Sequence, residues 1–129
     1  MADIRIRMIE RLAEIDPAAW DGVANPPGDA YDPFLSWNFL DALETSGSAV
    51  EQTGWAPRHL LAEDVDGRLI GALPLYLKGH SYGEYVFDHG WANAIERAGG
   101  RYYPKLLTAV PFTPATSRRI LATDPTVRA

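Results

Sequence analysis

The sequence predicts an α/β domain in which helices pack against a mixed sheet. Residues 4–9 alternate apolar and charged side chains with a period of two, which is typical of a half-buried strand. Asp16-Pro17 and Asp32-Pro33 each place a capping carboxylate before a proline in the first helical position. Asp66-Gly67 separates two apolar runs and suits a tight hairpin turn. The order of strand, two helices and hairpin indicates a sheet with helices packed against it.

The first half of the chain gives the clearest element boundaries. A short helix is expected over 17–23, and a longer one from Phe34 until Gly47 because its apolar residues recur at helical spacing. The hairpin strands are expected over 59–65 and 68–77. Pro74 lies within the second of these runs, and since proline donates no backbone hydrogen bond, it belongs at a bulge, an edge or a non-bonding position.

The second half is less regular. Residues 80–89 favour an extended conformation, 91–98 a short helix closed by Gly99-Gly100, and 102–110 a further strand, with another short element over 117–122. Asp124-Pro125 repeats the helix-start pattern, and only four residues follow it in the sequence. This pattern predicts that the chain is the front portion of a longer protein.

Length and composition define the class of protein. A chain of 129 residues with 47% hydrophobic content fits a single domain over 1–129 with a real core. The absence of cysteine excludes disulfides, thiolate metal sites and thiol nucleophiles. No apolar run reaches the roughly 20 residues that cross a bilayer, and the first residues lack a secretory pattern. We therefore expect a cytoplasmic protein without a membrane span.

Charge is distributed unevenly along the chain. The net charge of −5 argues against general nucleic-acid binding, which needs a surplus of cations. Residues 1–66 hold 4 basic and 13 acidic side chains, whereas residues 67–129 hold 8 basic and 4 acidic ones. The second half is thus the better candidate for an anionic ligand, unless the two halves simply complement each other or a further domain.

Polar and aromatic side chains concentrate between the hairpin and the strand that follows it. Glu84, Asp88 and His89 are the candidate catalytic residues, since each can take a proton from an amine or hydroxyl nucleophile. A solvated carboxylate or a capped loop is the commoner role for such residues, and it is the first alternative for each of them. The candidate substrate-binding residues are His80, Tyr82, Tyr85, Arg101, Tyr102, Tyr103 and Lys105.

These binding residues have two distinct expected roles. Arg101 and Lys105 would hold an anionic group of the substrate, and the four tyrosines would shape an apolar pocket with polar edges. The alternative is that the rings fill the core. A metal site is not expected: the four-residue spacing of His80, Glu84 and Asp88 would need a helix, whereas the run around Tyr85 favours a strand.

Several longer segments carry a family resemblance. The strongest are 80–88, 100–106 and 110–114, which read HSYGEYVFD, GRYYPKL and VPFTP, supported by 33–37 and 73–78. Together with neighbouring stretches they cover most of residues 33–114. They resemble the bacterial FemAB-like family of GNAT-type acyltransferases, which is associated with peptidoglycan biosynthesis.

The resemblance implies a GNAT-like fold, with a mainly antiparallel sheet flanked by helices, as an incomplete N-terminal unit of a longer tandem protein. It implies an acyl- or aminoacyl-transferase whose acceptor-facing half is this chain, inactive by itself. The acceptor would be a small molecule or a cell-wall precursor. Acyl-coenzyme A or aminoacyl-tRNA would be the donor for the full-length protein. A C-terminal GNAT-like half would complete the donor site, and no cofactor is expected to bind this piece alone. The alternative is a non-catalytic module that recognises a cell-wall precursor or a partner protein.

Overall fold

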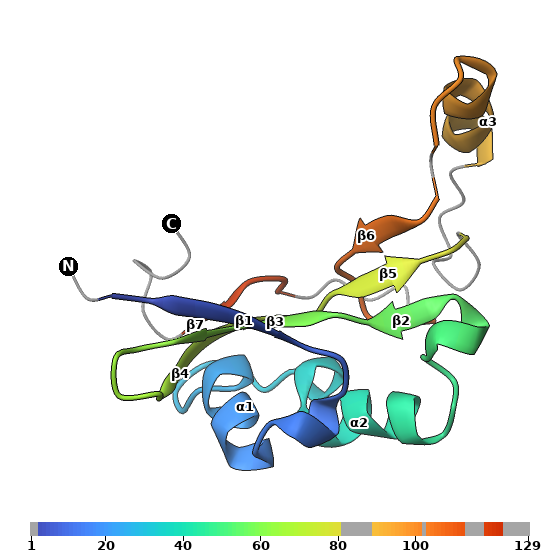
Figure 1. Ribbon diagram of the computed structural model, residues 1–129. Coiled ribbons are helices and arrows are strands. Elements are labelled where there is room, and N and C mark those ends of the chain that lie inside the picture. The colour runs from blue at the N-terminus through green and yellow to red at the C-terminus, as the bar shows by residue number, and fades with distance from the viewer. Residues whose placement is uncertain (1–2, 81–88, 102, 113–117, 123–129) are drawn as a thin grey trace.

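A computed structural model describes residues 3–80, 89–101, 103–112 and 118–122 of the chain. Its strands and helices follow the predicted order (Figure 1). Within the described residues they are β1 (Arg5–Ile9), η1 (Leu12–Glu14), α1 (Pro17–Ala24), η2 (Pro33–Leu35), α2 (Trp37–Thr45), η3 (Glu51–Thr53), β2 (Trp55–Pro57), β3 (His59–Glu63), β4 (Leu69–Leu73), β5 (Tyr76–Lys78), α3 (His89–Arg97), β6 (Lys105–Leu107) and β7 (Leu121–Ala122).

The strands form two antiparallel sheets that follow one another. Sheet A has the order β1-β3-β4-β7 and sheet B has the order β2-β5-β6. Only Arg58 separates β2 from β3, and only Pro74 and Leu75 separate β4 from β5, so the central strands pass from one sheet into the other (Figure 1). The break falls at Pro74, as expected for a residue without a backbone donor. The α/β class with a mainly antiparallel sheet is confirmed.

The two Asp-Pro pairs begin helices of different kinds. Asp16 caps α1 by accepting from the Ala19 amide, as the sequence predicts. Asp32 caps only the 3₁₀ turn η2, and the prediction of one helix from Phe34 is wrong in this respect. Ser36 intervenes with extended backbone and caps α2 through Oγ, which accepts from the Phe39 amide at 3.3 Å. The local serine cap therefore sets the start of α2.

The hairpin is confirmed, and the last two strands are shorter than expected. Asp64 accepts from the amides of Asp66 and Arg68, and Gly67 adopts a φ of 80°, so the turn closes at Asp66-Gly67. The strand expected over 102–110 is reduced to β6, and the element expected over 117–122 is the two-residue β7. The expected extended stretch over 80–89 falls largely outside the described residues.

The core lies between sheet A and the helices α1 and α2, which cover one face of that sheet (Figure 1). Trp20 at its centre is fully buried, and its indole Nε1 donates to the Leu35 carbonyl at 2.9 Å. Its other buried members include Ile9, Leu12, Leu35, Leu40, Leu61 and Leu121. A second, smaller cluster of Ala49, Trp55 and Tyr76 lies under sheet B. No helix among the described residues is long and apolar enough to traverse a bilayer.

Candidate functional site

His59 occupies the break between the two sheets and replaces a backbone acceptor there. The Arg58 amide donates to the Leu75 carbonyl at 2.8 Å, which continues the ladder. The Leu75 amide instead donates to His59 Nδ1 at 3.1 Å. Irregular points in a sheet are frequent beside functional sites, because they redirect side chains. The break thus fixes a buried imidazole in one orientation.

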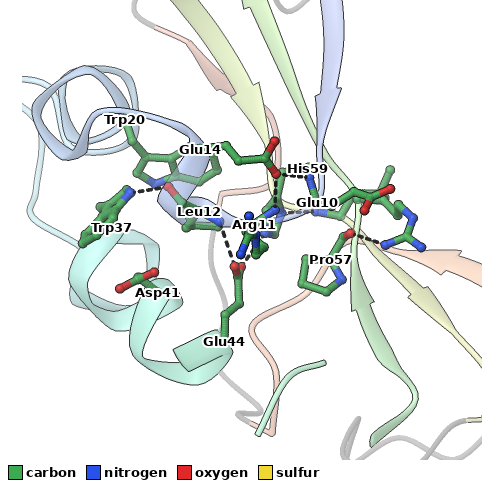
Figure 2. Close-up of polar contacts among 12 residues, drawn as sticks. Glu10, Arg11, Leu12, Glu14, Trp20, Trp37, Asp41, Glu44, Pro57 and His59 are labelled. Carbon is green, nitrogen blue, oxygen red and sulfur yellow. Dashed lines mark hydrogen bonds and ion pairs between the residues drawn. The ribbon is translucent and has the colours of Figure 1, made fainter. Parts of the chain in front are cut away.

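The tautomer of His59 follows from this contact. Since Nδ1 accepts, the proton lies on Nε2, which donates to Glu44 Oε2 at 2.8 Å. Glu44 Oε1 accepts from the Leu12 amide at 2.7 Å, as Figure 2 shows. His59 is fully buried and Glu44 is nearly so. One carboxylate therefore ties α2, η1 and β3 together, and both of its oxygens are engaged in the fold.

Tyr76 packs edge-on against His59, with ring centroids 5.2 Å apart and an interplanar angle of 87°. Its hydroxyl is buried and has no hydrogen-bond partner among the residues that the structure describes. Burial first, and the Glu44 carboxylate second, raise the pKa of Tyr76 well above its ordinary value. The folded protein therefore favours the neutral phenol of Tyr76 at a pH where a free tyrosine ionises.

Removing this hydroxyl should change the alkaline stability of the protein. Above pH of about 10 the unfolded chain loses the Tyr76 proton while the folded chain keeps it, so the free energy of unfolding falls with rising pH. The loss is expected to be about 1.4 kcal/mol per pH unit from this residue. Tyr76→Phe should remove this pH dependence of the free energy of unfolding. Urea unfolding curves between pH 9 and 11, roughly the range around the tyrosine pKa, measure it. Tyr31→Phe, at an exposed position, should leave the slope unchanged; equal slopes for Tyr76→Phe and wild type would contradict the assignment.

A pocket of about 580 Å³ lies beside the Glu44–His59 pair. Glu44 and Pro57 form part of its wall, and η1 and α2 border it (Figure 2). Carboxylates outnumber guanidinium groups in its lining, so it suits a cationic or zwitterionic group better than an anion. Among the described residues, no three histidine, aspartate or glutamate side chains are arranged so that they could hold a metal ion together. The charged side chains of the lining are Glu10, Arg11, Glu14, Asp41, Glu44, Glu51 and Arg58.

Two positively charged side chains lie in sheet B, at the end where Trp55 begins β2. Trp55, Lys78 and Lys105 lie opposite one another on β2, β5 and β6, so their side chains share one face of the sheet. Lys78 is fully buried, with Nζ 3.7 Å from the centroid of the Trp55 ring. Lys105 is half-buried, with Nζ 5.7 Å from the Tyr103 ring. Each ammonium group thus lies over an aromatic ring, a favourable arrangement.

The structure brings three of the predicted binding residues to this end of sheet B. His80 follows Lys78 by two residues, and Tyr103 precedes Lys105 by two, so both lie just beyond the paired lysines. The His80 imidazole packs directly against Gly54, where an added Cβ would collide with the ring. Arg101 is exposed in the connection between α3 and β6.

The other predicted site residues are not placed. Glu84, Asp88, Tyr82, Tyr85 and Tyr102 lie outside the described residues. His89 begins α3, but its side chain is likewise outside the described part.

Sequence reasoning missed Glu44, His59, Tyr76 and Lys78. A signal for Glu44 is present: it follows Leu40 by four residues and so falls on the buried face of α2. Lys78 is two residues from the buried Tyr76 on β5, so its side chain points to the same face of the sheet. A lysine at such a position is unusual in a core.

Comparison with known proteins agrees with the predicted resemblance. A family model described as FemAB-like, peptidoglycan biosynthesis/recognition, matches residues 11–129. This match places the chain among peptidoglycan-related proteins. The chain belongs to the FemAB-like family. Neither the curated proteins nor the solved structures contain a match to it.

Proposed function

We propose that this chain forms the acceptor-facing part of an acyl- or aminoacyl-transferase that acts on a peptidoglycan precursor. The observation that supports this most is the row of Trp55, Lys78 and Lys105 across sheet B, with two cations opposite each other on one face. Membership of the FemAB-like family supplies the peptidoglycan connection.

The paired lysines suit an anionic group of the acceptor. Two ammonium groups lie on adjacent strands at one end of a protein whose net charge is −5. Lys105 is half-buried and is the one of the pair that a ligand can contact. Lys78 is fully buried over Trp55 and acts on the ligand through its charge. Carboxylates and phosphates of a cell-wall precursor have the matching charge.

The chemistry of the transfer assigns complementary tasks to the remaining candidates. The acceptor nitrogen attacks the donor carbonyl carbon, a new C–N bond forms, and the bond from that carbon to the donor sulfur or oxygen breaks. The nitrogen loses a proton to a base, and the leaving thiolate or alkoxide gains one. Glu84, Asp88 and His89 are the candidate bases, and acyl-coenzyme A or aminoacyl-tRNA is the proposed donor. A C-terminal GNAT-like half would complete the donor site, and the cytoplasm is the proposed compartment.

The anion site is tested by a charge-removing substitution. Lys105→Gln should weaken binding of a soluble peptidoglycan precursor by about 10- to 150-fold, since one charge-assisted contact contributes about 1.5–3 kcal/mol. Isothermal titration calorimetry measures this directly. Arg68→Gln removes the same charge from the exposed hairpin turn and should leave the affinity unchanged. Equal affinities for Lys105→Gln and wild type would refute binding at this end of sheet B.

The second candidate function is a non-catalytic recognition module for a cell-wall precursor or a partner protein. One observation favours it: the Glu44–His59 pair has its polar atoms engaged in the fold and so offers no free base. Glu84→Gln and His89→Ala separate the two candidates in a protein that includes the proposed C-terminal GNAT-like half. A transferase should lose turnover and keep precursor binding, whereas a recognition module has no turnover in either form.

A further inference from the structure

The pocket beside the Glu44–His59 pair is bounded by four segments that are separated in the sequence. These segments are residues 10–14, 41–45, 50–51 and 56–58. The volume of about 580 Å³ lies within the range of small-molecule sites, roughly 300–1,000 Å³. Neither Lys78 nor Lys105 lines the pocket. A ligand bound here is therefore distinct from the anion proposed for sheet B.

Hydrogen bonds hold two walls of the pocket in place. Glu14 Oε2 accepts from the amides of Glu10 and Arg11, at 3.0 Å each, and closes the turn that leads into η1. Glu44 ties α2 to η1 through the Leu12 amide at 2.7 Å (Figure 2). The carboxylates of Glu14 and Glu44 thus serve the fold, and the pocket is formed before any ligand binds.

Three further carboxylates of the lining are not used in this way. Within the described part of the chain, the side chains of Glu10, Asp41 and Glu51 make no hydrogen bond or ion pair. They belong to three different segments, and Figure 2 shows Glu10 and Asp41 on different sides of Glu44. Negative charge therefore borders the pocket on more than one side, which favours an ammonium group.

A guanidinium group lines the same pocket without an ion pair. Arg58 is half-buried, and its Nη1 donates to the Pro57 carbonyl at 2.6 Å, which holds the group against its own backbone. Five carboxylates line the pocket, yet none of the described carboxylates pairs with Arg58. A cation that is held in place but not neutralised suits a carboxylate of a ligand. The other cation of the lining, Arg11, is exposed.

We propose that this pocket binds an amino acid in its zwitterionic form. The ammonium group of the ligand contacts Asp41 and the other unengaged carboxylates, and the carboxylate of the ligand contacts Arg58. A ligand with a single charge neutralises only one kind of side chain, whereas an amino acid carries both charges on one carbon atom. The apolar part of the lining, which suits an aliphatic side chain, consists of Ala13, Val50, Ala56 and Pro57.

Three small molecules of similar shape test which charges the pocket recognises. L-leucine carries both charges, isoamylamine lacks the carboxylate, and isocaproate lacks the ammonium group. Each is titrated into isotope-labelled protein at matched ionic strength, because salt screens exposed charges. The amide signals of Thr45, Glu51 and Arg58 report on three walls of the pocket. L-leucine should give saturable shifts, and the other two should bind at least about tenfold more weakly, since each lacks one charge-assisted contact.

Two variants with matched controls identify the residues that bind. Asp41→Asn and Arg58→Gln should each weaken L-leucine binding by about tenfold or more. Asp66→Asn and Arg68→Gln make the same changes at exposed positions of the hairpin turn and should bind like wild type. Far-UV circular dichroism checks the fold of each variant. The Asp41 carboxylate makes no hydrogen bond within the described residues, so Asp41→Asn should fold normally.

Saturable binding of L-leucine that both pocket variants weaken is the expected result. The proposal is overturned if L-leucine gives no saturable shift of these signals. It is overturned as well if isoamylamine or isocaproate binds as tightly as L-leucine, because the pocket then recognises only one charge. Unchanged affinity in Asp41→Asn or Arg58→Gln has the same meaning. None of these results concerns the lysines of sheet B, so a failure here is distinguishable from a failure of the proposed function.

Discussion

Replacing Glu44 by alanine is expected to lower the free energy of unfolding by about 3–5 kcal/mol. The carboxylate accepts from the Leu12 amide and from His59 Nε2, at 2.7 and 2.8 Å, and Glu44 is buried. Its removal leaves two buried donors without an acceptor, and His59 also loses the contact that holds its tautomer. Urea unfolding followed by circular dichroism measures the effect.

Two matched variants make this expectation specific. Glu44→Gln keeps one acceptor oxygen but turns an amide donor toward the second donor, so it should cost about 1–3 kcal/mol, less than alanine. Asp41→Ala removes a carboxylate from the same helix and the same pocket, and should change stability by no more than about 0.5 kcal/mol. Equal stabilities for Glu44→Ala and Asp41→Ala would show that the buried pair does not hold α2 to β3.

Replacing Trp55 by alanine is expected to cost a similar amount, about 3–5 kcal/mol. The indole is fully buried and contacts Tyr76 and Phe112, each at 5.3 Å between ring centroids. It also underlies the Lys78 ammonium. The substitution therefore opens a cavity and removes the ring that stabilises a buried charge, which should also weaken precursor binding at the same end of sheet B.

A double-mutant cycle separates packing from the charge contact. Trp55→Phe and Lys78→Met, made singly and together, should show a coupling free energy of about 0.5–2 kcal/mol. Tyr31→Ala, which removes an exposed ring, gives the baseline for an aromatic loss without burial. Additive effects of Trp55→Phe and Lys78→Met would mean that the ammonium gains nothing from the indole.

The elements that the sequence predicted well are those fixed by local chemistry. The Asp16-Pro17 start of α1 and the Asp66-Gly67 turn depend on side chains within a few residues of the backbone they shape. The start of α2 was mispredicted although its signal is local too, because Ser36 competes with Asp32 as the cap. Local patterns indicate that a helix begins, and nearby caps decide where.

The candidate site was predicted in part, for a related reason. His80, Tyr103 and Lys105 stand out by composition, and the β5–β6 register brings them together. The Glu44–His59 contact joins residues 15 positions apart through the packing of α2 on the sheet, which no local pattern encodes. The apolar alternation of β1 indicated a strand, but it did not indicate that Ile6 is exposed while Ile9 packs in the core, since that depends on how β1 pairs with β3.

Nuclear magnetic resonance mapping with a soluble peptidoglycan precursor is the most direct test of the account. Titration of the precursor into isotope-labelled protein should shift the amide signals of Lys105, Tyr103 and His80, with Lys78 and Trp55 following through the shared sheet. Shifts confined to the pocket around Glu10 and Asp41, or no shifts at all, would contradict the claim that the paired lysines of sheet B bind the acceptor.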